Sequence, residues 1–528
     1  ASRSLVSSWS PSTQDLFSQG MTFLDSFYDP RAGYLYDLSS AEGLRHESRQ
    51  TVFYALGLLA RNQGQDAVQA AKILYNIVGG QITDPDSGAY GDYQIYPEQP
   101  AFGPGYPAEA YGNYYPISRS IMGNAMVVAL EEFPHLLSED LVGTLKSSLE
   151  LNLKSNFTPT QAPSGTAYSL TTSFLALWGG KNLPNLSNTT GINATAQGAA
   201  LAKQVIDNFD EYGSIPEYNS APYLTFTFWP LAMAAKYLGN DTELGQRAPD
   251  LIASTWTSLG EWYHADLKNL AAPISRGFGY DLTRYMHSFG LYLWDMAGHE
   301  NSPFYQLEHV NPIPRVTDFA NTMMTALYSS TMNQYVPADV LAEIKQFSGE
   351  RSVNATAFVA AKDLVTQNLT AWLSDNITIG AVSFSQVAAG GPYTESIYIP
   401  GAIQWHTGGL DNEVGYINVY PNEASMHIVA SANLLNVSLP DATAGSTIQF
   451  QVVAFADGHT FASWDDATGL LVQASGTADM NYTVGFAGSL GGTGGSPIEE
   501  FEFWNVTYSM PSDFEAGDVP WIALEVST

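Results

Sequence analysis

The sequence predicts an α + β multidomain protein, with an N-terminal (α/α) helical toroid followed by an antiparallel β-sheet or sandwich domain. Apolar residues recur at three-to-four spacing from about residue 11 to 350, which is typical of amphipathic helices. After about Leu373 the segments alternate or are rich in β-branched residues, which is typical of strands. A length of 528 residues is enough for two domains. We therefore expect the toroid at 1–372 and the β-sheet domain at 373–528.

Most of the helices expected in the front part have a Ser, Thr, Asp or Pro start. Helices joined by loops in this way predict stacked helical hairpins. Pro230 should kink the helix that begins near Tyr223. Long aromatic, Gly/Pro-rich loops at 84–116 and 264–281 interrupt the pattern, and such loops usually carry function. The expected helices are Thr13–Tyr28, Arg49–Asn62, Asp66–Val78, Ile117–Glu132, Ser138–Leu151, Tyr168–Leu177, Ala196–Asn208, Tyr223–Leu238, Asp250–Tyr263, Leu282–Met296, Val316–Ser329 and Ala338–Phe347.

The strands expected in the rear part are bounded by Gly, Asn, Asp and Ser clusters, the clearest being the glycine-rich run 491–495. Several short strands in succession predict an antiparallel sandwich or a large sheet. The expected strands are Ile377–Gln386, Ser396–Ile399, Gly415–Tyr420, Ser425–Ala430, Thr447–Phe455, Leu470–Gln473, Tyr482–Ala487, Glu500–Tyr508 and Trp521–Val526.

The charge balance excludes some partners. The chain carries 20 Lys and Arg against 52 Asp and Glu, a net charge of −32, so a nucleic-acid partner is not expected. Lys362 is the last basic residue, and any cationic contact to an anionic ligand must therefore come from the front domain. With no cysteine, thiol nucleophiles and cysteine-based zinc sites are excluded. The nine histidines are scattered and the familiar cofactor motifs are absent, so we expect neither a metal nor a cofactor.

Eleven Asn-X-Ser/Thr sequons favour a secreted, glycosylated eukaryotic protein. No apolar run is long enough to span a membrane. The chain starts on mostly polar sequence, which suggests a mature protein whose leader was removed. We expect a monomer outside the cell. The sequons are Asn156, Asn185, Asn188, Asn193, Asn240, Asn354, Asn368, Asn376, Asn436, Asn481 and Asn505.

Two segments concentrate polar and aromatic side chains in the front domain. The first carries Glu217, Tyr218, Asn219 and Tyr223 in a turn that opens a helix, and it is either a wall of a site or a helix N-cap with aromatics packed beneath it. The second carries Arg276, Tyr280, Asp281, Arg284 and His287 around a glycine hinge. Its arginines match a carboxylate ligand, or one of them forms a structural ion pair with Asp281.

Three further groups are candidates for contacts to a ligand. Asn113, Tyr114 and Tyr115 close the first long loop and can form a flat platform for sugar rings, with Arg119 just beyond; core packing is the alternative. The run 45–49 is either part of the same cavity or a solvated helix start. In the rear domain, Tyr398, Gln404, Trp405 and His406 can close a cleft between the domains, although a buried histidine is usually structural.

Tyrosines, an arginine and an asparagine suit β-elimination at a uronic acid. The C5 proton is only weakly acidic, so its removal requires donors that stabilise charge on the adjacent carboxylate. A phenol beside an arginine can take this proton, and a phenol can protonate the leaving O4. In this interpretation Arg276 and Asn219 stabilise the carboxylate, and Tyr223 or Tyr218 acts as base and acid. Tyr280, Arg284, Glu217 and Trp405 are expected to contact the substrate.

The order of domains, aromatic platform, tyrosine segment and Ile274-Ser275-Arg276 resembles polysaccharide lyase family 8, which includes lyases for hyaluronan, chondroitin, xanthan and, in fungi, mannuronan-type alginate. Asn113-Tyr114-Tyr115 resembles the aromatic patch of that family, and Tyr223 resembles its catalytic tyrosine. The resemblance implies a lyase for an acidic, alginate-like polysaccharide. The family's histidine falls on Ser214 and one of its arginines on Ala272. These departures leave the base open between His406, His287 and a tyrosine that performs both steps.

Two other interpretations remain. In an (α/α) glycoside hydrolase, Glu217 and Asp281 would be the general acid and base on either side of a neutral glycan. The negative net charge favours this alternative, because it repels a polyanion. A non-catalytic glycan-binding protein is the third interpretation, which any turnover of a glycan would exclude.

Overall fold

A computed structural model describes most of the chain and gives twelve α-helices among the described residues. Those residues are 5–37, 45–100, 116–155, 166–186, 193–213, 215–277, 279–310, 318–359, 363–387, 398–408, 413–454, 460–491 and 497–528. The helices are α1 (Pro11–Asp25), α2 (Ser48–Arg61), α3 (Asp66–Gly79), α5 (Pro116–Glu132), α6 (Glu139–Lys154), α7 (Thr166–Asn182), α8 (Ala194–Tyr212), α9 (Thr225–Met233), α10 (Glu243–Trp262), α11 (Ser288–Ala297), α12 (Thr322–Asn333) and α13 (Ala338–Lys345).

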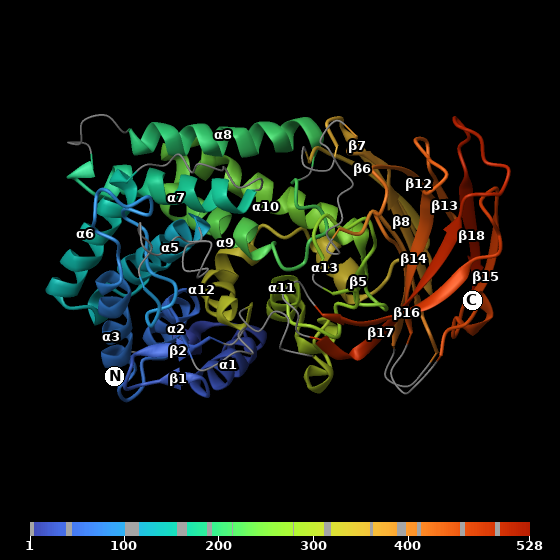
Figure 1. Cartoon of the computed structure of the whole chain (residues 1–528). Helices are drawn as coiled ribbons and strands as arrows, with labels where there is room; N and C mark the ends of the chain where they lie inside the picture. Colours follow the sequence, from blue (N-terminus) through green and yellow to red (C-terminus); the bar gives the residue numbers. More distant parts are fainter. Residues whose placement is uncertain are drawn as a thin grey trace.

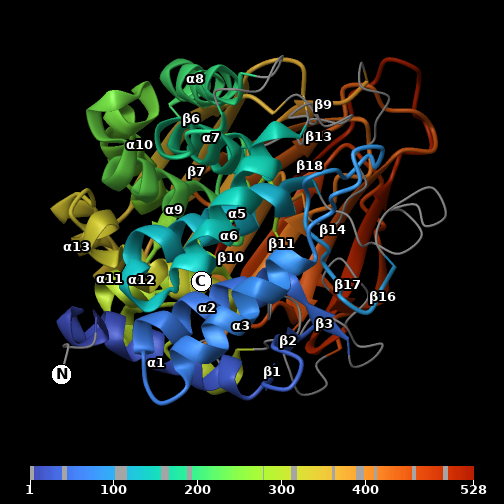
Figure 2. The same ribbon diagram turned by 90° about the vertical axis from the view of Figure 1, so that its left-hand side faces the viewer.

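The helices form two layers in a ring. Helices α2, α5, α7, α9 and α12 contact one another in that order, and α12 returns to α2. Outside them, α3 packs on α2, α6 on α5, α8 on α7 and α10 on α9. Most residues of inner helices such as α2 and α7 are buried, because an inner helix has neighbours on nearly all sides. This arrangement confirms the predicted helical hairpins (Figures 1 and 2).

Several helices begin where a side chain caps the free N–H groups of the first turn. Ser10 caps α1, Glu47 caps α2, Ser138 caps α6 and Thr242 caps α10. Helix α9 continues through Pro230 and ends in a π-helical turn at Ala234–Leu238.

The rear part is a two-sheet antiparallel sandwich. One sheet has eight strands in the order β16-β17-β14-β11-β10-β8-β7-β6, and the other has five in the order β15-β18-β13-β12-β9. The strands are β6 (Arg351–Ala357), β7 (Gln367–Leu373), β8 (Ile377–Val382), β9 (Phe384–Ser385), β10 (Gly401–His406), β11 (Val414–Val419), β12 (Ser425–Ser431), β13 (Leu434–Ser438), β14 (Thr447–Ala454), β15 (Leu471–Gly476), β16 (Thr483–Gly491), β17 (Pro497–Ser509) and β18 (Trp521–Ser527). Among the described residues, five short strands lie in the helical part. A three-stranded sheet is formed by β1 (Tyr28–Asp29), β2 (Tyr34–Tyr36) and β3 (His46–Glu47), and a separate pair by β4 (Tyr263–His264) and β5 (Asn269–Leu270).

The sheet begins earlier than the sequence predicts. Strand β6 starts at Arg351 and β7 ends at Leu373, so the expected boundary between 372 and 373 falls inside the eight-stranded sheet. The prediction also lacked β10 and β13. Strands such as β6 carry small polar residues and do not show the β-branched pattern on which the prediction relied.

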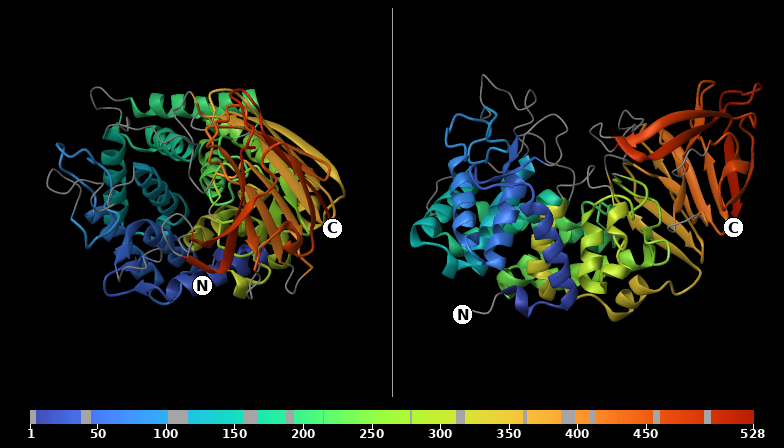
Figure 3. Two further views of the ribbon diagram at one scale, coloured as in Figure 1. Left: turned by 45° about the vertical axis from the view of Figure 1, so that its right-hand side comes forward. Right: turned by 90° about the horizontal axis from the view of Figure 1, so that it is seen from below.

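The two parts pack directly against each other, as the views from several sides show (Figure 3). Ile274 and Ile399 form a β-bridge, with N–O distances of 2.9 and 3.0 Å. A side chain at Gly380 of β8 would collide with the Ala272 carbonyl, so glycine lets the 271–277 segment lie on the sheet. No helix among the described residues has the length and apolar content needed to cross a membrane.

Candidate functional site

Two segments of the helical part are joined so that one arginine is held beside one tyrosine. The Ser275 amide donates to the Tyr218 carbonyl at 3.1 Å. The Ser220 hydroxyl donates to the Arg276 carbonyl at 2.5 Å and is fully buried. The bridge from Ile274 to Ile399 fixes the other side of the arginine segment to the sheet. The backbone of Arg276 is therefore anchored from both domains.

The Arg276 guanidinium lies over the Tyr223 ring, 4.6 Å from its centroid. Both residues are partly exposed, whereas their neighbours Ser220, Ser275 and Ala221 are buried. A cation over an aromatic face is attracted by the ring, which orders both side chains. The structure thus presents a guanidinium and a phenol together at an accessible position.

Glu217 caps a helix. One carboxylate oxygen accepts from the Thr166 amide at 2.8 Å and the other from the Thr166 hydroxyl at 2.6 Å. Thr166 begins α7, so Glu217 satisfies free donors at the N-terminus of that helix. Burial raises the pKa of Glu217, while the Thr166 hydrogen bonds and Arg276 oppose that rise. The prediction that Glu217 contacts substrate is therefore corrected, because Thr166 occupies both of its oxygens.

Asn219 serves the backbone of the arginine segment. It has a left-handed backbone with φ of 53°, which asparagine tolerates better than most residues. Its amide nitrogen donates to the carbonyls of Pro273 at 3.0 Å and Ala271 at 3.4 Å. The prediction that this amide stabilises a substrate carboxylate is corrected, because its donors already point into the protein.

Tyr218 belongs to the core. Its side chain is 5% exposed, and its hydroxyl lies 3.4 Å from Gln367 Oε1. Burial, followed by the neighbouring Tyr398, raises the pKa of Tyr218 well above its ordinary value. A buried phenol that resists ionisation is a poor base, so of the two predicted tyrosines only Tyr223 has a suitable environment.

The side chains of the second predicted segment, Tyr280, Asp281 and Arg284, mainly make structural contacts within the protein. Tyr280 is buried and its hydroxyl donates to Gln451 Oε1 at 2.6 Å, which corrects its predicted contact with substrate. Asp281 is buried and accepts from Asn269 and from Thr283. Arg284 Nε lies 3.8 Å from Asp281 Oδ2. Of the two alternatives for these arginines, a carboxylate ligand or a structural ion pair with Asp281, the structure supports the ion pair for Arg284.

Tyr398 lies beside Tyr218, next to the bridge between Ile274 and Ile399, whereas Trp405 and His406 are at the other end of the adjoining strand β10. Trp405 is fully buried and its indole donates to the Thr468 carbonyl at 2.8 Å, so it cannot contact a sugar. His406 is the last residue of β10, and the first residue of that strand, Gly401, follows Ile399 closely in the chain. The five residues from Gly401 to His406 span roughly 17 Å at the rise of a β-strand. Burial lowers the pKa of His406, although Asp266 opposes this. The structure therefore does not bring His406 to Tyr223.

His287 is a helix cap in the core. It is fully buried, its Nδ1 accepts from the Gly290 amide at 3.1 Å, and its Nε2 lies 2.9 Å from the Leu282 carbonyl. These contacts use both ring nitrogens and leave no proton acceptor for a substrate. The suggestion that His287 acts as the base is therefore wrong.

Arg119 supports the base of the first long loop. It donates to the Ser155 hydroxyl at 2.6 Å and to the Tyr90 carbonyl at 2.9 Å, contacts that favour a structural role over the predicted one. Asn113, Tyr114 and Tyr115 lie outside the described residues, as do Ser214, Asn156 and Asn188. The aromatic platform therefore stays a prediction.

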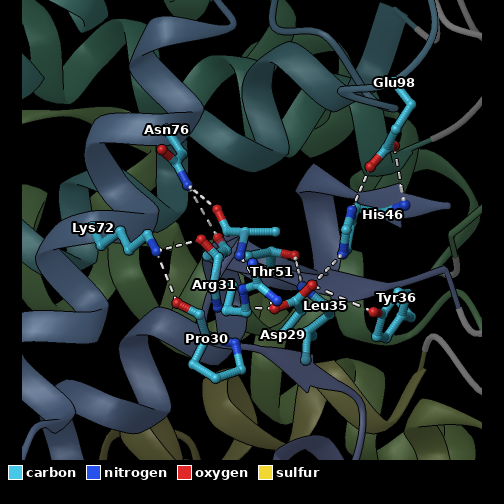
Figure 4. Close-up of polar contacts among 12 residues, drawn as sticks. Asp29, Pro30, Arg31, Leu35, Tyr36, His46, Thr51, Lys72, Asn76 and Glu98 are labelled. Atoms are coloured by element: carbon cyan, nitrogen blue, oxygen red, sulfur yellow. Dashed lines mark hydrogen bonds and ion pairs between the residues drawn. The ribbon is translucent and has the colours of Figure 1, made fainter.

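The run 45–49 lies in the small sheet near the N-terminus. Figure 4 shows His46 between two carboxylates, with Nδ1 bonded to Glu98 and Nε2 3.5 Å from Asp29. Its ring stacks on Tyr36, with centroids 4.6 Å apart. Glu47 caps α2, and burial raises its pKa to about 7.

Most sequons within the described residues lie on the surface. Asn436 and Asn505 are exceptions and are partly buried in strands. The exposed sequons are Asn185, Asn193, Asn240, Asn354, Asn368, Asn376 and Asn481. Among the described residues, no group of three or more His, Asp or Glu side chains is placed to hold a metal ion.

Comparisons with known proteins identify two families that match this chain. Two families, both described as domains of unknown function, match the chain: DUF8769 over residues 14–330 and DUF8770 over residues 349–527. No curated protein matches the chain.

Similar solved structures include heparinase III, with 9% identity and a TM-score of 0.46 over 98% of this chain and 85% of that one. The chondroitin AC lyase of Streptomyces coelicolor A3 has 10% identity and a TM-score of 0.44 over 97% of this chain and 79% of that one. The heparan sulfate lyase HepC from Pedobacter heparinus has 8% identity and a TM-score of 0.35, over 98% and 83%. With TM-scores below 0.5, these likenesses do not bear on the activity of this chain.

Proposed function

We propose that this chain, which belongs to the family described as a domain of unknown function (DUF8769), is a secreted polysaccharide lyase. The proposal rests on the residues of the chain itself. It cleaves a uronic-acid-containing glycan by β-elimination, with Tyr223 as the acid and base and Arg276 as the group that binds the uronate carboxylate. The observation that carries this proposal is the Arg276 guanidinium 4.6 Å above the Tyr223 ring, with both side chains accessible.

The chemistry uses a cation and a phenol in sequence. Arg276 pairs with the carboxylate at C6, which favours the extra negative charge that develops there as H5 leaves. Tyr223 accepts H5 as the phenolate, the C4–O4 bond breaks, a C4–C5 double bond forms, and the phenol so formed gives the proton to O4 and returns to the phenolate. In mannuronate and glucuronate H5 and O4 lie on the same side of the ring, so one residue can reach both.

The substrate class follows from the same pair of residues. A guanidinium binds a carboxylate through parallel hydrogen bonds, which neutral sugars cannot form. The resemblance to family 8 lyases suggests an alginate- or polymannuronate-like polymer. Secretion is supported by the sequons on exposed strands and loops, where a glycan can be accommodated.

Incubation with alginate, glucuronan and hyaluronan tests the proposal. Elimination generates an unsaturated uronate, which absorbs in the ultraviolet, together with new reducing ends. New reducing ends without that absorbance would show hydrolysis instead, and the lyase proposal would be wrong.

Replacing Tyr223 by Phe tests the assignment of acid and base. We expect Tyr223→Phe to lower kcat by at least about a hundredfold, because proton transfer by a placed group contributes about 10²–10⁴. Tyr218→Phe is the matched control, and it should keep wild-type kcat because that hydroxyl is buried. Steady-state rates from the unsaturated product, with circular dichroism as a check on folding, decide the point. Equal losses in both variants would contradict the assignment.

A further inference from the structure

The face of the eight-stranded sheet that is turned toward the helical part carries two rows of mostly polar, uncharged residues. The first row begins at the contact with Tyr280. Cross-strand pairing places Asn418 of β11, Gln451 of β14, Asn505 of β17 and Gly485 of β16 in one row. Residues paired in this way share a face of the sheet. The row starts where the apolar contact of Val453 and Phe503 with the helical part ends.

The second row lies one pleat further along the strands. Thr507 pairs with Gln449 on one side and with Thr483 on the other, and the Tyr420 amide donates to the Gln449 carbonyl at 2.9 Å. Gln449, Thr507 and Tyr420 are partly exposed, and Thr483 is exposed. The two rows therefore form a polar surface of amides, hydroxyls and one phenol.

Exposure in the first row increases toward the edge of the sheet. Asn418 and Gln451 are 2% and 7% exposed, Asn505 is partly exposed and Gly485 is exposed. A Cβ built on Gly485 meets no atom within 4 Å, so the space above this end of the row is open. Three strand spacings separate Asn418 from Gly485, which is about 14 Å and longer than one sugar ring.

The first row contains a buried polar atom that has no hydrogen-bond partner in the described part of the chain. The Asn418 amide interacts with the neighbouring Tyr280 hydroxyl, whereas Oδ1 of Asn505 is buried without a hydrogen bond to the described part of the chain. A buried amide oxygen without a partner is rare in folded proteins and needs an explanation. An amide both donates and accepts, which matches the hydroxyl groups of a sugar.

The charges around the rows select against a uniformly anionic polymer. No Lys or Arg follows Lys362 in the sequence. A carboxylate placed on this face would meet no cation from the rear domain. The same rows offer a neutral sugar hydrogen bonds without repulsion.

We propose that these rows bind the neutral sugars of a polysaccharide in which neutral residues separate the uronates, while Arg276 receives the uronate. This inference rests on the proposed function for its polysaccharide substrate. It differs from the alginate-like substrate suggested by the resemblance, because every unit of polymannuronate carries a carboxylate.

Gly485→Trp tests the inference by filling the open space beside Asn505. Phe486→Trp is the matched control, since it adds bulk at the next residue, on the opposite face of the same strand. With hyaluronan, where neutral sugars alternate with uronates, we expect Gly485→Trp to raise KM about tenfold at unchanged kcat, the sign of lost binding outside the reacting centre. Phe486→Trp should leave both constants unchanged. An unchanged KM for Gly485→Trp, or better turnover of polymannuronate than of hyaluronan by the wild type, would overturn the inference.

A second variant and a second readout separate this inference from the proposed function. Asn505→Leu keeps the approximate size of the side chain and removes the unpartnered Oδ1, so its KM for hyaluronan should also rise. Electrophoresis through gels that contain hydroxyethylcellulose, a neutral polysaccharide, measures binding without turnover. Retardation of the wild type that Gly485→Trp abolishes would support the neutral subsite even if no polymer is eliminated. Equal mobility of wild type and variant in these gels would contradict it, whatever the chemistry.

Discussion

At the residue scale, burial decides which of the candidate side chains can act. The sequence places Tyr218 and Tyr223 in one turn and gives no means to choose between them. In the structure Tyr218 is buried beside Tyr398 and Gln367, whereas Tyr223 is partly exposed under the Arg276 guanidinium. Arg276 could be proposed from the sequence because its residue type fits the chemistry, whereas the preference for Tyr223 over Tyr218 depends on the structure. The capping role of Glu217 could not be predicted, because its partner Thr166 is 51 residues away in the chain.

Glu217→Gln distinguishes the lyase from the hydrolase interpretation. We expect kcat to stay within about twofold of wild type and the free energy of unfolding to fall by about 1 kcal/mol, the usual value of a helix cap. A general acid or base would instead cost about 10²–10⁴ in rate. Thermal denaturation and the product assay measure the two effects. A rate loss of that size in a folded protein would revive Glu217 as a catalytic acid.

At the scale of elements, periodicity predicted the helices well and the strands less completely. The expected Asp66–Val78 and Ala338–Phe347 differ from α3 and α13 by no more than two residues at either end. By contrast, α10 begins at Glu243 and continues through Pro249, so the expected start at Asp250 was late. Strand β10 has the buried sequence GAIQWH, in which Gln404 contacts the helical part at the Leu270 carbonyl. The rows on β11, β14, β17 and β16 depend on strand pairing, which local sequence does not contain.

Asp295 couples three helices and should make stability depend on pH. It lies in α11 and accepts from Thr13 of α1 and Asn333 of α12. Burial raises the pKa of Asp295 to about 6, against the opposing hydrogen bonds of Ser329 and Thr13. Because the folded state holds the proton more tightly than the unfolded state, this group contributes stability below about pH 4 that is lost as the pH rises through about 6.

Asp295→Asn removes this dependence. Relative to wild type, the variant should gain up to about 3 kcal/mol between pH 4 and 7, since each pKa unit corresponds to about 1.4 kcal/mol. Urea unfolding of both proteins at several pH values measures the difference. A difference that stays constant across this range would show that Asp295 does not titrate as described.

At the scale of the whole molecule, the two regions of the chain that match different families form one connected structure. The boundary between them, at residues 330–349, agrees with the start of the sheet at Arg351 and not with the predicted boundary at 372. Tyr416 of the sheet donates to Asn269 of the helical part at 2.7 Å, and Arg351 donates to the carbonyl of Tyr263 at 2.8 Å. The sheet therefore positions the arginine segment as well as closing one side of the molecule.

The net charge of −32 predicts an unusual dependence on salt. A polyanion is repelled by the surface as a whole and attracted only near Arg276. Raising the ionic strength from about 0.01 to 0.15 M shortens the screening length from about 30 to 8 Å, which weakens the long-range repulsion most. We expect kcat/KM for hyaluronan to rise severalfold over this range. A steep fall, as found when a basic surface attracts the substrate, would contradict this account of the charges.

The central claim, cleavage by elimination, is tested most directly by digestion in water enriched in oxygen-18. Elimination breaks the C4–O4 bond and leaves the glycosidic oxygen on the new reducing end, so mass spectrometry should find no solvent oxygen in it beyond that of a non-enzymatic exchange control. The other fragment should be lighter by one water than a hydrolysis product. Incorporation of one solvent oxygen at each cleaved bond, with no unsaturated fragment, would show hydrolysis and contradict the account.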